Sequence, residues 1–150
     1  TTVVAAGVLV LGALAPAVGP TPLPVGPPER SAPSAPTAAV VLPVEGGRLV
    51  RAFEAPTVRW GPGHRGVDLA ATVGAPVRAP ADGVVVVAQR VVDREVVTVL
   101  HADGLRSSLE PVAGDLPVGT AVAAGDVVGR VGTGGHCSGC VHWGVRDGDR

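Results

Sequence analysis

Short apolar runs rich in valine fill the chain from about residue 47 onward, and glycine-containing or polar turns separate them. Such runs, bounded by turn residues, are typical of strands. No stretch of ten or more residues has the 3.6-residue period of an amphipathic helix. We therefore predict an all-β fold, a small antiparallel sheet with a barrel-like core. The predicted strands cover residues 75–79, 83–91, 96–101, 105–109, 121–131 and 141–146.

The first 46 residues have a different character. Residues 3–15 form an uncharged apolar run, which is shorter than the roughly 20 residues of a membrane span. The run is typical of a secretory signal, and Ala15-Pro16-Ala17 matches a cleavage motif. We expect a signal-like apolar segment at 1–17, a disordered Pro-rich linker at 18–46 and the folded domain at 47–150. This organisation predicts an exported protein, either extracellular or associated with the cell envelope.

Composition changes this picture in one respect, because it excludes a class of partner. The 150 residues carry a formal net charge of -1, and aromatic residues make up 2% of them. With neither a basic excess nor an aromatic platform, we expect no nucleic-acid binding. A domain of about 100 residues can bury one modest core, and we expect it to be a monomer.

Candidate chemistry gathers around three residues. His64 and Asp68 lie four positions apart in a Gly-rich segment that leads into a strand, and His142 lies on the last predicted strand. Two imidazoles and one carboxylate suit Zn²⁺ and leave a fourth position for water, which the ion would activate as a nucleophile. A His and an Asp at this spacing also occur as a turn cap or a surface pair. The second His favours the metal site.

Five segments, in this order along the chain, carry a resemblance to a known family. They are His64-Arg-Gly-Val-Asp68-Leu-Ala, residues 74–85, residues 99–104, residues 118–129 and Val141-His142-Trp-Gly-Val-Arg. Together they resemble the lysostaphin-type (LytM-like) zinc metallopeptidases, over about residues 49–146, as a degenerate, actinobacterial-like member. The resemblance implies an antiparallel β-fold with an active-site groove, zinc held there by His64, Asp68 and His142, and cleavage of stem or cross-link peptides of bacterial peptidoglycan.

Two histidines that assist catalysis in this family are replaced. The first position of the family's final His-x-His pair is Cys140, and Leu109 and Pro111 stand where a Tyr-x-His segment is expected. Glu110 and His136 are the candidate substitutes for proton transfer, which is worth about 10²- to 10⁴-fold in rate. Each also has a plainer interpretation, as a solvated turn residue or a surface histidine.

Cys137 and Cys140 are the only two cysteines. An even count in a chain that we expect to be exported favours a disulfide between them. Two alternatives stay open: Cys140 as a fourth ligand that closes a structural metal site, and Cys140 as a nucleophile paired with His142.

Three functions follow as hypotheses. The first is an exported zinc peptidase acting on peptidoglycan cross-links, with Glu110 or His136 moving the proton. The second is a catalytically inactive module that keeps the fold and binds peptidoglycan, or regulates a hydrolase through a cell-wall protein partner. The third is a structural β-domain in which zinc or the disulfide only adds stability.

Overall fold

The computed structural model describes residues 39–148, which form ten strands and no helix. The all-β prediction is confirmed. Within this range, no helix is long and apolar enough to cross a membrane. The strands are β1 (Leu49–Arg51), β2 (Val67–Ala70), β3 (Pro76–Arg78), β4 (Gly83–Val91), β5 (Arg94–Leu100), β6 (Leu105–Glu110), β7 (Val112–Gly114), β8 (Ala121–Val122), β9 (Val127–Val131) and β10 (Cys140–Asp147).

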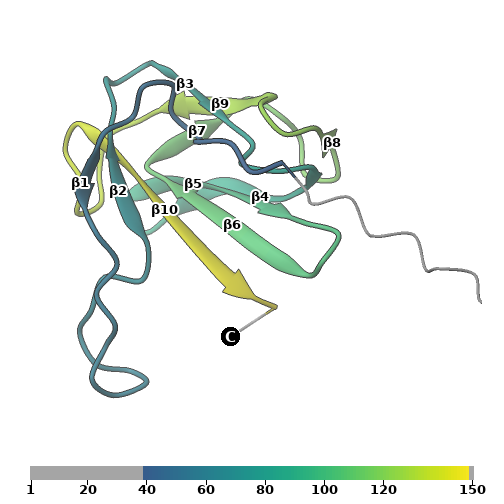
Figure 1. Ribbon diagram of the computed structural model, residues 1–150. Helices are drawn as coiled ribbons and strands as arrows, with labels where there is room; N and C mark the ends of the chain where they lie inside the picture. Colours follow the sequence, from purple (N-terminus) through teal and green to yellow (C-terminus); the bar gives the residue numbers. More distant parts are fainter. Residues whose placement is uncertain (1–38, 149–150) are drawn as a thin grey trace, which may run out of the picture. The chain divides into compact units, whose positions relative to one another are not determined.

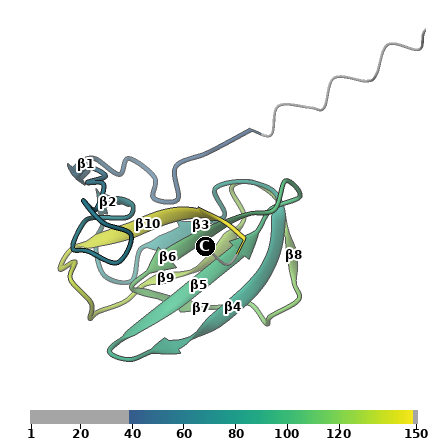
Figure 2. The ribbon, with the colours of Figure 1, turned by 90° about the horizontal axis from the view of Figure 1, so that it is seen from below.

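The strands form two antiparallel sheets. The larger has seven strands in the order β1-β2-β10-β6-β5-β4-β8, and the smaller has three in the order β3-β9-β7. Figure 1 shows the small sheet lying against one side of the large one. Seen from below, the long strands β4, β5, β6 and β10 curve together along the large sheet (Figure 2). The last of the described strands, β10, thus lies between β2 and β6, in the interior of the sheet.

The hydrophobic core lies between the two sheets. Alternate residues of β5, β6 and β10 point into it, because successive side chains of a strand face opposite sides. Valine makes up most of the core, because the sequence offers few larger apolar residues. The fully buried members include Val77, Val97, Val99, Leu109, Val112, Val128 and Val141.

The single strand predicted over residues 121–131 is two strands, β8 and β9, and the prediction was wrong for residues 123–126. A turn separates β8 from β9. Within the turn, the carboxylate of Asp126 accepts a hydrogen bond from the backbone N–H of Ala123. Gly125 has a φ of 90°, a conformation that few other residues adopt. The short strands β1 and β7 were not predicted either, because three residues are too few to show an alternating pattern.

The described chain begins before the expected domain boundary at residue 47. Val44 is buried in the core cluster, and the backbone of Val41 and Pro43 is hydrogen-bonded to Pro80 and Arg78. The last part of the expected linker, residues 39–46, therefore packs on the domain. The signal-like segment 1–17 and residues 18–38 of the linker lie outside the described residues.

Truncation of Leu109 tests this core. Leu109→Ala should lower the free energy of unfolding by about 2–5 kcal/mol, since it leaves a cavity in a fully buried site. Leu105→Ala, on the same strand but partly exposed, should cost less than about 1 kcal/mol. Denaturant titration measures both values. Equal losses would contradict the assignment of Leu109 to the core.

Candidate metal centre

The candidate residues lie on the face of the large sheet that is turned away from the core. Val141 points into the core, so its neighbour His142 points to the opposite side. His142 is directly opposite Asp68 on β2 and directly opposite Glu110 on β6. Directly opposed residues of antiparallel strands share a face, with Cβ atoms about 4.5–5.5 Å apart. The three side chains therefore form one row across β2, β10 and β6.

His64 enters this row from the loop that precedes β2. An isolated bridge ties its backbone to Glu54, with N···O distances of 2.9 Å in both directions. The His64 Nδ1 lies 2.7 Å from the carbonyl oxygen of Ala52, which can only accept a hydrogen bond. Nδ1 therefore carries the proton, and in the neutral ring the lone pair is on Nε2. That lone pair points at the other members of the site.

Three imidazole nitrogens converge on a single carboxylate oxygen. Asp68 Oδ1 is 2.8 Å from His142 Nδ1, 2.9 Å from His64 Nε2 and 3.2 Å from His136 Nε2. His64 Nε2 and His142 Nδ1 are themselves 3.0 Å apart. The donor atoms of His64, Asp68, His136 and His142 all lie within 4.8 Å of one another. The structure thus brings together all three predicted ligands, and adds His136 to them.

Asp68 is ionised in this setting. Burial of its side chain acts to raise the pKa of the carboxyl, but hydrogen bonds from His142 and His136, and from His64 when both of its ring nitrogens carry a proton, outweigh burial and hold the pKa below its usual value. A buried carboxylate is costly unless its charge is compensated, so this group favours a cation beside it.

Gly66 explains the spacing of the first motif. A Cβ atom on this residue would lie 2.6 Å from Nε2 of His142 and would collide with the backbone oxygen of Trp143. Glycine at this position lets the segment between His64 and Asp68 pass directly over the His142 ring. The sequence pattern therefore reflects close packing as well as ligand spacing.

His136 belongs to a loop between β9 and β10 that is fixed at both ends. The predicted disulfide between Cys137 and Cys140 is present, with Cα atoms 5.5 Å apart, and it confirms the pairing. On the other side, Gly134 and Gly135 adopt positive φ angles and pack on Asp93 and Arg94, where a side chain at Gly134 would collide with a backbone oxygen.

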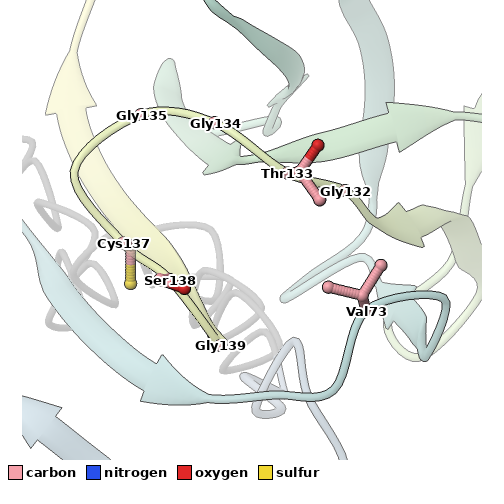
Figure 3. A pocket seen from close by; sticks show the side chains of 8 residues that line it. All are labelled: Val73, Gly132, Thr133, Gly134, Gly135, Cys137, Ser138 and Gly139. Atoms are coloured by element: carbon pink, nitrogen blue, oxygen red, sulfur yellow. The ribbon is translucent and has the colours of Figure 1, made fainter.

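The inner side of this loop borders a hollow, shown in Figure 3. Its lining is mostly glycine, together with a few small side chains. The lining residues are Val73, Gly132, Thr133, Gly134, Gly135, Cys137, Ser138 and Gly139. None of the four clustered metal-ligand candidates lines it. The hollow thus lies beside the cluster without including its side chains, and it leaves space beneath the loop.

Glu110 is held by an ion pair. Its Oε2 is 3.1 Å from Nε of Arg94, and both residues lie on the same face of the sheet as His142. Arg94 also lies beneath Gly135 of the His136 loop. No local sequence pattern marks Arg94, because its contact with Glu110 arises only when β5 pairs with β6.

The residues that the resemblance places at two family histidine positions have structural roles. Leu109 and Pro111 are fully buried, and Cys140 is part of the disulfide. The disulfide removes Cys140 as a metal ligand or nucleophile. His101 lies away from the cluster, with its ring between the Asp82 carbonyl oxygen at 2.8 Å and the Ser107 hydroxyl at 2.9 Å.

Solved structures with a similar fold include several peptidases. A mutant catalytic domain of the prophage-encoded M23 protein EnpA from Enterococcus faecalis is 31% identical, with a TM-score of 0.59 over 71% of this chain and 87% of that one. The SpoIIQ–SpoIIIAH pore forming complex includes a chain that is 25% identical, with a TM-score of 0.63 over 73% of this chain and 84% of that one.

Among curated sequences, uncharacterized proteins of Mycobacterium tuberculosis and Mycobacterium bovis are 43% identical over 100 residues. The match covers 65% of this chain and 40% of each relative, so the chain spans less than half the length of these proteins. Residues 62–150 match the model of Peptidase family M23, and this stretch includes all four clustered residues and Glu110. On the evidence of this match and of the similar structures, the chain belongs to the M23 peptidases, the family of the lysostaphin-type enzymes.

Proposed function

We propose that this chain is an exported, zinc-dependent peptidase domain that cleaves peptide cross-links of bacterial peptidoglycan. The observation that carries the proposal is the convergence of three side chains. His64 Nε2, Asp68 Oδ1 and His142 Nδ1 lie 2.8–3.0 Å from one another. Membership of a peptidase family supports the reaction class. The disulfide supports export, because such bonds persist in oxidising compartments.

The donor set fits zinc on chemical grounds. Imidazole nitrogen and carboxylate oxygen are ordinary zinc ligands, with bonds of about 2.0–2.2 Å. The hydrogen bond to the Ala52 carbonyl turns the Nε2 lone pair of His64 toward Asp68 Oδ1. A lone pair that faces a carboxylate oxygen is unfavourable unless a proton or a cation lies between them. A metal ion satisfies both groups at once.

Zinc bound by these three residues would polarise the scissile carbonyl and activate water for attack on the amide. This chain must still supply a group that moves the proton. Glu110 is suited to that task, because it is directly opposite His142 and on the same face of the sheet. Arg94 engages its Oε2 and restrains the side chain next to the site. We assign the role of general base to Glu110.

A second function has support from a specific observation. The positions of both family histidines are occupied by residues with structural roles, so the domain could keep the fold and the metal without cleaving peptides. One similar structure is described as part of a pore forming complex, which is an assembly rather than an isolated enzyme. In this alternative the domain binds peptidoglycan or a cell-wall protein partner.

Zinc should stabilise the folded domain. At a free concentration about 100 times its dissociation constant, zinc should add about 2.7 kcal/mol to the free energy of unfolding, with a matching rise in Tm that a chelator reverses. Asp68→Ala should abolish the rise, because it removes the carboxylate shared by the three imidazoles. Asp115→Ala, at an exposed position, should keep it. An unchanged zinc effect in Asp68→Ala would overturn the ligand assignment.

Glu110→Gln should separate binding from catalysis. We expect release of new amino groups from purified peptidoglycan to slow by about 10²- to 10⁴-fold, since the amide cannot accept the proton. Zinc affinity should be unchanged, because Glu110 is not among the metal-ligand candidates.

Glu95→Gln, in the neighbouring hairpin, is the matched control and should keep full activity. Full activity in Glu110→Gln would exclude Glu110 as the base. If the zinc-loaded parent protein releases no amino groups in long incubations, the peptidase proposal fails and the binding function takes its place.

A further inference from the structure

We infer that His136 is a fourth metal ligand, which closes the site in the resting domain and withdraws to admit substrate. The inference rests on the proposed zinc site at His64, Asp68 and His142. It assigns to His136 a role different from that of a proton carrier. It also predicts a regulated site, because a metal held by four protein ligands has no position for water or substrate.

The geometry of the cluster supports a four-residue set. Ligand atoms about 2 Å from a tetrahedral ion lie about 3.3 Å apart. His136 Nε2 is 3.2 Å from Asp68 Oδ1, close to that value, and its ring centroid is 5.0 Å from that of His142 and 5.5 Å from that of His64. The three rings stand edge to face with interplanar angles of 60–81°. They surround one point rather than stack.

The loop is anchored on both sides of His136 and so holds its side chain beside the cluster. Its disulfide begins at the residue that follows His136 and ends at the first residue of β10, two positions before His142. On the other side, Gly135 directly precedes His136 and packs on Arg94. The loop is thus tied down immediately before and immediately after the imidazole. Such fixed placement is expected of a ligand and is not needed for a solvated surface histidine.

His136 is also the only one of the four that is placed to leave. Its side chain is 42% exposed, whereas those of His64, Asp68 and His142 are 4%, 5% and 13% exposed. The other three come from the sheet or the segment bridged to Glu54, but His136 comes from a Gly-rich loop with a hollow beneath it. A rotation of this side chain opens the cluster without disturbing the core.

The consequence is an exchange of one ligand for another. If His136 Nε2 withdrew from a bound metal ion, the position that it left would be open to an oxygen atom of water or of the substrate. Substrate binding must therefore compete with His136. Removal of the imidazole should weaken metal binding, and should leave the metal open to small external ligands.

Cobalt-substituted protein tests the inference without reference to activity. The parent protein should give the intense visible absorption of four-coordinate cobalt, and azide should not change it. His136→Gly should give a different spectrum that azide perturbs, and added imidazole should restore the parent spectrum by filling the vacated position. Ser138→Ala, in the same loop, is the matched control and should behave like the parent.

Zinc affinity gives a second readout. Changes to residues that merely support a ligand cost about 10- to 100-fold in affinity, so we expect His136→Gly to lose at least about tenfold. Restoration by imidazole shows that the variant is folded. X-ray absorption spectroscopy of the zinc-loaded parent, which needs no variant, should show three imidazoles and one carboxylate.

Two results would overturn the inference. One is an azide response of the parent equal to that of His136→Gly, and the other is equal zinc affinity in the two proteins. Either result, with zinc still bound and peptidoglycan still cleaved, would leave the proposed function intact. Loss of affinity in His136→Gly with no cleavage by any variant would support the ligand role and reject the peptidase.

Discussion

The register of β10 between β2 and β6 is the constraint on which the candidate site depends. A slip of one residue would turn His142 into the core and expose Val141, because the side-chain period of a strand is two. Burial of Val141 and Leu109 between the two sheets opposes such a slip. Since β10 pairs with both neighbours, the same register places Asp68 and Glu110 on either side of His142. The hydrophobic core therefore sets the geometry of the polar face.

The polar face has a charge balance of its own. Asp68 is buried and ionised, and a buried carboxylate is costly unless other groups compensate its charge. Three imidazoles surround it, yet the His64 ring is oriented by a backbone carbonyl so that it presents a lone pair in its neutral form. The centre is thus better suited to a cation than to a closed network of hydrogen bonds. This property, rather than the mere proximity of histidines, distinguishes it from a structural His–Asp pair such as a turn cap.

Much of the fold and three members of the candidate metal site follow from the sequence, and the rest depends on long-range pairing. Valine-rich runs and glycine turns predict most of the strands, and the sequence motifs predict His64, Asp68 and His142 as metal-ligand candidates, which the structure brings together. The short strands β1 and β7 show no periodicity of their own, and a turn inside a continuous apolar run separates β8 from β9. Likewise, no local pattern links Arg94 to Glu110, or the Ala52 carbonyl to the orientation of His64, because strand pairing and loop closure create these contacts.

The departures from the family pattern are connected through the loop before β10. Cys140 stands where the resemblance to the family implies a histidine, and as half of a disulfide it cannot carry a proton. The same cysteine forms the bond that holds the residue next to His136 and so brings a different imidazole to Asp68. The disulfide therefore links the cysteine at the expected histidine position to the placement of His136 beside Asp68. An imidazole held in this way on an anchored loop favours a metal site in which His136 takes part.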